Sequence, residues 1–230
     1  MSLVIVATLA LSSACSANDT PAADAAPPTS VANAQSVAAP GGARIVVQGV
    51  DVTDYGHDIG KVGAPIVIVE LSDFGCVYCA KHALETLPAL ETEFVETGKV
   101  FYKHIPFIIG MFPNSDRAAR AAECAGEQDR FWAMHDSVFT RQKDWKKGSD
   151  ADGLFRSIAR GVVADEASWS SCYDARRVDQ RTTAASALAA RLGVRATPTF
   201  FINGQMVEGA LPLDVMRQGL NAMLANPAAP

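Results

Sequence analysis

Residues 66–79 read Ile-Val-Ile-Val-Glu-Leu-Ser-Asp-Phe-Gly-Cys-Val-Tyr-Cys. The first six form a short apolar run rich in β-branched side chains, which is typical of a strand buried on both faces. Two cysteines three positions apart, Cys76 and Cys79, follow where a helix is expected to begin. The stretch therefore predicts a buried strand that leads into a Cys-x-x-Cys pair at a helix N-terminus.

The position of the cysteine pair at a helix N-terminus predicts its reactivity. A helix N-terminus presents unpaired N–H groups and the positive end of the helix dipole, which stabilise a thiolate and lower the pKa of Cys76. Because the thiolate is the attacking species in disulfide exchange, Cys76 is expected to form mixed disulfides and Cys79 to resolve them. The alternatives are a static disulfide or half of a zinc site. Zinc would need two more ligands, and although His82 lies nearby, no second Cys-x-x-Cys occurs.

Outward from this stretch, the hydrophobic pattern alternates between strand and helix. Upstream, residues 45–47 are predicted as an edge strand that residues 50–52 extend. Downstream, the pattern predicts a helix over 79–96 with a kink at Pro88, a strand over 99–105, helices within 114–171, a helix over 178–192, a hairpin around Asn203-Gly204 and a helix over 212–224.

Three separated motifs occur in the order that one family shows: residues 64–79, the segment Ala122–Ala125 with Phe131-Trp132, and residues 196–204. In these motifs the chain resembles the thioredoxin superfamily, and specifically the DsbA-like thiol:disulfide oxidoreductases. The resemblance covers about residues 60–224. It implies an α/β thioredoxin fold in residues 44–230, with a helical subdomain inserted at about 113–178, and an enzyme that requires no metal or organic cofactor.

The resemblance also implies roles for single residues. Thr197-Pro198 has the position of a cis-proline that faces the active-site disulfide and leaves the backbone before it free to pair with a substrate peptide; without the resemblance, a trans proline ending a loop is the simpler interpretation. Glu70 stands where the family often keeps a buried acid, so burial should raise its pKa and make it a proton acceptor for Cys79 through water. Its alternative is a strand-end glutamate that reaches solvent.

The two residues between the cysteines depart from the family's common pattern. Val77 replaces a frequent proline, and Tyr78 replaces the histidine of the most oxidising members. Tyr78 can donate a hydrogen bond but adds no positive charge near neutral pH. A less extreme thiolate than in those members is therefore expected on Cys76.

Five cysteines leave two more to explain within the domain and one before it. Cys124 and Cys172 lie in the helical block, and in an exported protein they are expected to form a structural disulfide. The alternative is two free cysteines that act as small buried apolar residues.

The first residues carry targeting information. Residues 3–11 are almost uniformly apolar and too short to span a bilayer, and small residues follow, which predicts a secretory signal peptide over 1–14. The small-residue run before Cys15 resembles a bacterial lipobox, so Cys15 is a lipidation candidate; an ordinary signal peptide is the alternative. Residues 15–43 are rich in Ala, Pro, Ser and Asn and are predicted to be a disordered tether. We therefore expect a periplasmic protein whose membrane contact is a lipid anchor.

The function predicted for this 230-residue chain is thiol:disulfide exchange in the bacterial cell envelope. The net charge of −5 argues against nucleic-acid binding. Cysteine-containing exported proteins are the expected substrates, oxidised by the Cys76–Cys79 disulfide, and a membrane redox partner would reoxidise the pair. The alternatives are a disulfide isomerase or reductase kept reduced, and a non-catalytic thiol module that binds metal.

The remaining polar residues carry less weight. His57, His104 and His135 are expected to be structural or solvent-exposed, whereas His82 lies one turn after Cys79 and is expected to tune the site modestly. The lysines of residues 143–147 are interpreted as a solvated surface.

Overall fold

The structure is a computed structural model that describes residues 44–226. The predicted signal peptide (1–14), the tether (15–43) and Cys15 lie outside the described residues. Among the helices that are described, none is long and apolar enough to cross a membrane.

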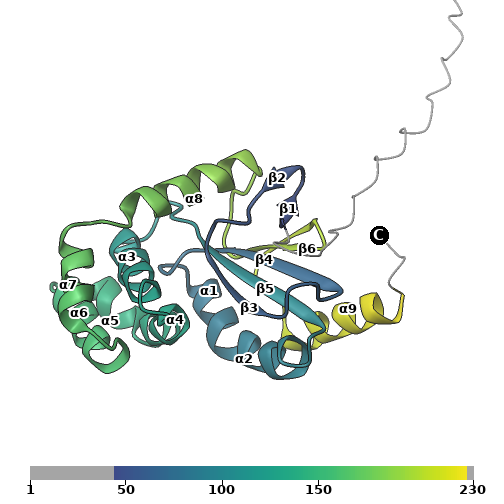
Figure 1. Cartoon of the computed structure of the whole chain (residues 1–230), viewed down its shortest axis with the longest axis horizontal. Coiled ribbons are helices and arrows are strands. Elements are labelled where there is room, and N and C mark those ends of the chain that lie inside the picture. Colours follow the sequence, from purple (N-terminus) through teal and green to yellow (C-terminus); the bar gives the residue numbers. More distant parts are fainter. Residues whose placement is uncertain (1–43, 227–230) are drawn as a thin grey trace, which may run out of the picture. The chain divides into compact units, whose positions relative to one another are not determined.

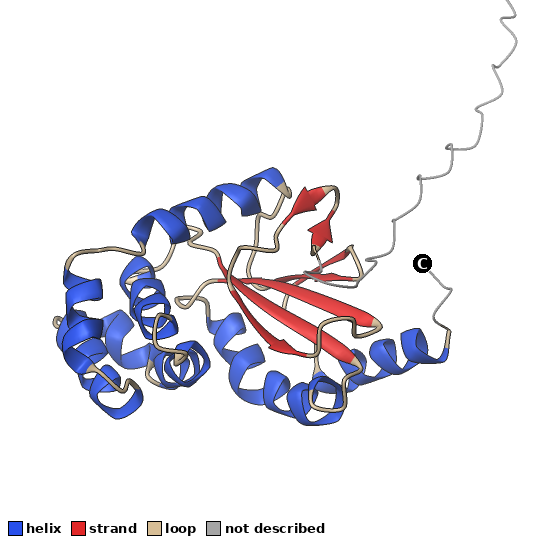
Figure 2. Cartoon of the chain, viewed as in Figure 1, coloured by secondary structure: helices blue, strands red, loops and turns tan. Residues whose placement is uncertain are grey.

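A five-stranded mixed sheet forms the centre of the described region (Figure 2). Its strand order is β3 (His57–Gly60), β5 (Val100–Pro106), β4 (Ile66–Ser72), β6 (Thr199–Ile202) and β7 (Gln205–Glu208). Strands β4 and β5 are parallel, and the other neighbours are antiparallel. Every residue of β4 is buried, which confirms the central strand that the sequence predicts.

The alternation of side chains along β4 assigns each residue to one face of the sheet. Val67, Val69 and Leu71 pack in the core that includes helix α8 (Asp179–Arg191). Ile66 and Ile68 pack on the other side, with residues of α2 (Leu87–Leu90) and α9 (Leu213–Ala225). Glu70 shares the parity of Ile66 and Ile68, so its side chain faces the helical segment that follows the cysteine pair.

That segment is helical over the stretch that the sequence predicts, but π-helical turns interrupt the α-helix. It consists of α1 (Val77–Lys81), the π-helical turn η1 (His82–Thr86), α2 and a second π-helical turn, η2 (Glu91–Val95). Pro88 lies in the first turn of α2, directly after η1. Because proline has no N–H to donate, the change of hydrogen-bond pattern there accommodates it without ending the helical path.

Five helices lie between β5 and α8 and group together beside the sheet (Figure 1); they cover the stretch predicted to be helical, 114–171, and end slightly beyond it, at Asp174. They are α3 (Ser115–Gly126), α4 (Phe131–Thr140), α5 (Gln142–Lys147), α6 (Ala151–Val162) and α7 (Glu166–Asp174). Their apolar core includes Trp145, Phe155 and Trp169 and also contains Cys76 and Cys79. The helical block therefore packs directly against the cysteine pair.

The N-terminal part of the fold differs from the prediction. Residues 45–52 do not form one extended edge strand, because β1 (Val46–Val47) and β2 (Val50–Asp51) fold back on each other as a hairpin. The turn is made by Gln48 and Gly49, both at positive φ. One edge strand of the main sheet is instead β3, which the sequence did not predict because most of its residues, His-Asp-Ile-Gly, have little intrinsic β-propensity.

Candidate active site

The loop between β4 and α1 fixes the position of Cys76. Asp73 accepts hydrogen bonds from the backbone N–H of Gly75 (2.8 Å) and Ile109 (2.9 Å) and from the Ser115 hydroxyl. The Cys76 N–H donates to the Asp73 carbonyl at 2.9 Å. Cys76 thereby takes the N-cap position of α1 with an extended backbone, so its side chain lies at the end of the helix where N–H groups are unpaired.

Cys76 and Cys79 are both thiols in this structure, and their environments move their pKa values apart. A hydrogen bond from the Cys79 thiol, together with hydrogen bonds from the backbone N–H groups of Cys79 and Tyr78, lowers the pKa of Cys76 to about 6 against the opposing effect of burial. Burial raises the pKa of Cys79 well above its usual value. At neutral pH the pair therefore holds its thiolate on Cys76.

Thr197 and Pro198 lie against this thiol. The Thr197–Pro198 peptide bond is cis, and the Cys76 thiol donates a hydrogen bond to the Thr197 carbonyl with 3.2 Å between sulfur and oxygen. The arrangement has the geometry that the resemblance implied, with the cis-proline beside the first cysteine. Tyr78 stabilises the Cys76 thiolate through its backbone N–H, and the residue itself is 63% exposed.

Glu70 is buried beneath the pair, so the interpretation as a solvent-reaching glutamate is wrong. Its side chain is shielded from solvent, and its carboxylate accepts a hydrogen bond from the Tyr102 hydroxyl at 2.7 Å. Burial raises the pKa of Glu70 to about 7, although the hydrogen bond from Tyr102 opposes this shift. A group with this pKa exchanges protons readily near neutral pH.

Two side chains of α5 hold the loop that carries Cys76, and no local sequence pattern indicates either contact. Gln142 donates through Nε2 to the carbonyl oxygens of Phe74 (2.6 Å) and Cys76 (2.8 Å). Lys146, interpreted from the sequence as part of a solvated surface, donates to the Gly75 carbonyl and lies over the Phe112 ring. These contacts bridge about 70 residues of chain, so no local pattern reports them.

The histidines fall into two groups. His82, His104 and His135 are buried, and His57 pairs with Glu123 at 3.2 Å. Burial lowers the pKa of His82, His104 and His135, so these three are neutral at physiological pH. Within residues 44–226, no three His, Cys, Asp or Glu side chains are placed to hold a metal ion together.

The Cys124 and Cys172 side chains are joined by a disulfide that ties α3 to α7. Trp169 adds a hydrogen bond between the same helices, from its indole N–H to the Ala121 carbonyl at 3.0 Å. The covalent link closes a loop of 48 residues in the helical block.

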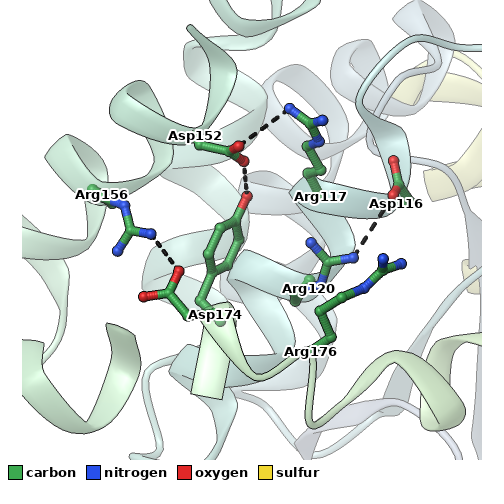
Figure 3. Close-up of a pocket in the computed structure, with 8 residues that line it drawn as sticks. Asp116, Arg117, Arg120, Asp152, Arg156, Asp174 and Arg176 are labelled. Atoms are coloured by element: carbon green, nitrogen blue, oxygen red, sulfur yellow. Dashed lines mark hydrogen bonds and ion pairs between the residues drawn. The ribbon is translucent and has the colours of Figure 1, made fainter. Parts of the chain in front are cut away.

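A charged cavity lies between α3, α6 and α7 (Figure 3). Each of its four arginines has an aspartate partner: Arg117 pairs with Asp152, Arg120 with Asp116 and Asp179, Arg156 with Asp174 and Arg176 with Asp179. Because these charges compensate one another, we interpret the residues around the cavity as a structural network of ion pairs. It contains none of the residues that surround Cys76.

Removing Gln142 is expected to destabilise the Cys76 loop. In Gln142→Ala the buried carbonyls of Phe74 and Cys76 lose their shared donor, which should lower the free energy of unfolding by about 2 kcal/mol in urea titrations. Gln128→Ala is the matched control, because the Gln128 amide bonds the Asp165 backbone at an exposed position where water can replace it. Equal losses in the two variants would contradict this account of Gln142.

Comparison with known proteins assigns the family. The model of the family described as Thioredoxin matches residues 52–222. The chain belongs to the thioredoxin family. The family assignment agrees with the predicted α/β thioredoxin fold. Together with its relatives, it identifies the chain as a protein thiol:disulfide oxidoreductase.

Proteins similar to this chain include both short and much longer ones. A Bacillus cereus protein named "Probable disulfide bond formation protein D" is 28% identical over 65% of this chain and 71% of its own length. The Na(+)/H(+) antiporter NhaA of Herminiimonas arsenicoxydans is 33% identical over 67% of this chain, which spans only 23% of the antiporter. The crystal structure of oxidised BdbD from Bacillus subtilis shares the fold, with a TM-score of 0.66, 22% identity and coverage of 74% of this chain and 92% of BdbD.

Proposed function

We propose that the Cys76–Cys79 disulfide of this oxidoreductase oxidises cysteine pairs in exported proteins. The observation that carries the proposal is the position of Cys76, at the N-cap of α1 and in hydrogen-bond contact with Thr197 before the cis-proline. The lowered pKa of Cys76 stabilises the reduced pair relative to the disulfide. A disulfide whose reduced form is stabilised is an oxidant, which favours this direction.

The reaction follows from the two thiol environments. A substrate thiolate attacks Cys76 Sγ, a mixed disulfide forms, and the electron pair of the broken bond leaves on Cys79, which takes up a proton from Glu70. A second substrate thiolate then attacks the substrate sulfur and releases Cys76 as a thiolate. The substrate gains a disulfide, and Cys76 and Cys79 are left reduced.

The backbone at Thr197 is proposed to hold the substrate peptide, and Tyr78 to lie on the surface that this peptide meets. Thr197 lies beside the reacting sulfur, and Tyr78 and Val77 are exposed next to it. Such exposed apolar side chains beside a reactive group suit contact with an unfolded chain rather than with a small polar molecule.

The place of action is part of the proposal. Residues 1–14 act as a lipoprotein-type signal peptide, Cys15 carries the lipid, and residues 15–43 tether a catalytic domain of residues 44–230, into which residues 113–178 insert the helical subdomain. The apolar run of residues 3–11 and the small residues before Cys15 support this organisation. In the periplasm a membrane partner would reoxidise the pair. The Bacillus cereus relative, a probable disulfide bond formation protein by name, also agrees with this direction.

The direction of the reaction is tested with two substrates. The oxidised protein is mixed with a reduced peptide that contains two cysteines, and the reduced protein with a protein whose disulfides have been scrambled. We expect rapid peptide oxidation and little repair of the scrambled protein. Rapid repair without peptide oxidation would show an isomerase instead, and stoichiometric metal binding without exchange would show a thiol metal-binding module.

The pH dependence of Cys76 alkylation tests the source of its reactivity. Iodoacetamide labelling of the reduced protein should lose half its rate as pH falls through about 6, because the thiolate is the reacting form. In Cys79→Ala the midpoint should rise toward 9, since the largest stabilising hydrogen bond is gone. Cys79→Ser keeps a donor and should stay nearer the parent midpoint. An unchanged midpoint in Cys79→Ala would show that Cys79 does not stabilise the thiolate.

A further inference from the structure

Behind the cysteine pair, three side chains form a hydrogen-bonded chain that ends at Glu70. The Tyr102 hydroxyl of β5 donates to Glu70 Oε2 at 2.7 Å, and the same hydroxyl lies 3.0 Å from His82 Nε2. The phenol has one hydrogen, which goes to the carboxylate, so the imidazole must donate through Nε2–H. The hydrogen bonds therefore run from His82 to Tyr102 to Glu70.

The three hydrogen-bonded side chains are buried, and the first of them, His82, lies on the helical segment that carries Cys79. Glu70, Tyr102, His82 and Cys79 are each at most 1% exposed. His82 lies three residues after Cys79 on the same helical path, and the Glu70 charge is among the causes that raise the pKa of Cys79. The three hydrogen-bonded side chains thus lie between the helical segment that carries Cys79 and strands β4 and β5, shielded from bulk water.

Other titratable groups near this chain do not supply the same interaction. Cys76 affects Glu70, and Glu91 affects Tyr102, only through their charges. Burial keeps His104 and His135 neutral. Burial likewise lowers the pKa of His82 to about 3, so His82 acts as a neutral donor. Among the described residues, the Tyr102 hydroxyl is the side chain that donates a hydrogen bond to the Glu70 carboxylate, since the buried Ser72 hydroxyl has no hydrogen-bond partner.

We propose that Tyr102 and His82 are positioning residues, which orient the Glu70 carboxylate toward Cys79 and set how strongly it holds the proton exchanged with that thiol. This proposal rests on the proposed function, because it concerns the proton step of the same exchange. When Cys79 resolves a mixed disulfide, its thiol proton passes to Glu70. The Cys79 thiolate attacks Cys76 Sγ, and the other sulfur leaves with the electron pair and takes a proton from solvent. Cys79 is oxidised and the departing sulfur is reduced.

The proposal predicts a pH shift in Tyr102→Phe. The Cys76–glutathione mixed disulfide is prepared, and release of glutathione by Cys79 is followed as a function of pH. In the parent protein the rate should rise through about pH 7 as Glu70 ionises. Without the phenol hydrogen bond the carboxylate is less stable, so the rise should move upward by about 1 to 2 pH units. Glu70→Gln should abolish the rise.

His82 is tested with a pair of variants. His82→Leu removes the donor to Tyr102 and should shift the rise in the same direction by a smaller amount, whereas His82→Gln keeps an N–H donor and should restore the parent profile. If Tyr102→Phe fails to fold, this pair makes the same comparison. Alkylation of Cys76 should keep its midpoint in all these variants, because neither Tyr102 nor His82 contributes to its pKa.

Tyr173→Phe is the matched control. The Tyr173 hydroxyl also donates to a carboxylate, that of Asp152 at 2.7 Å, but it lies in the helical block away from Cys79. This variant should leave the pH profile unchanged. Superposition of the Tyr102→Phe and His82→Leu profiles on that of the parent would overturn the positioning role. Failure of the parent mixed disulfide to release glutathione at any pH would instead overturn the proposed function itself.

Discussion

Cys76→Ser is expected to reduce the oxidation of a two-cysteine peptide to the rate of buffer alone, because a serine hydroxyl cannot form the mixed disulfide. Cys79→Ser should behave differently. It keeps the reactive Cys76 thiolate but loses the thiol that resolves the intermediate, so disulfide-linked complexes with substrate should accumulate. Electrophoresis without reductant and mass spectrometry of the linked peptides identify the sulfur involved.

The structure gives the reason for this asymmetry. Cys76 lies at the end of α1 with a thiolate stabilised by Cys79 and by backbone N–H groups, whereas Cys79 is fully buried and its pKa is raised. We therefore expect Cys76 to be the first sulfur that a substrate thiolate attacks, and the first to attack when the pair is reduced. Trapped complexes linked through Cys79 in a Cys76→Ser protein would contradict this order.

The second large effect concerns stability. Removing the Cys124–Cys172 disulfide with Cys124→Ala and Cys172→Ala releases a loop of 48 residues in the unfolded chain. In the chain-entropy model this loss lowers the free energy of unfolding by about 4 kcal/mol, which corresponds to a decrease of roughly 10 °C in the melting temperature of a domain this size. Thermal unfolding followed by circular dichroism measures the change.

The controls for this prediction use the other cysteine pair. Cys76→Ala with Cys79→Ala removes two thiols without opening a disulfide loop in the reduced protein, so its melting temperature should change much less. The protein without Cys124 and Cys172 should still oxidise peptide below its melting temperature, because the bond lies in the helical block. An unchanged melting temperature would contradict the prediction that this disulfide stabilises the protein by lowering the entropy of the unfolded chain.

The sequence predicted the parts of the site whose signals are local. The apolar run before the cysteines gave the central strand, and the spacing of Cys76 and Cys79 gave their place at a helix start. The alternation along β4 even determines which face Glu70 occupies. The resemblance to DsbA-like proteins supplied the position of Pro198, which residue spacing alone left open.

Parts of the site held by distant contacts could not be predicted. Gln142 and Lys146 reach the Cys76 loop from a helix about 70 residues away, and Lys146 looked like an ordinary surface charge. Strand β3 forms because its backbone pairs with β5, not because of its own residues. Tyr102 belongs to an apolar strand, and only the parallel register of β4 and β5 brings its hydroxyl to Glu70.

The most direct test of the redox assignment is a titration of the cysteines in glutathione buffers, read by alkylation and mass spectrometry. The account predicts that Cys76 and Cys79 change together in one two-electron step, at a potential more oxidising than about −230 mV, while Cys124 and Cys172 stay paired. A Cys76–Cys79 midpoint below about −270 mV, in the range of a cytosolic reductant, would contradict the oxidising role. A pair that never interconverts would contradict the catalytic role.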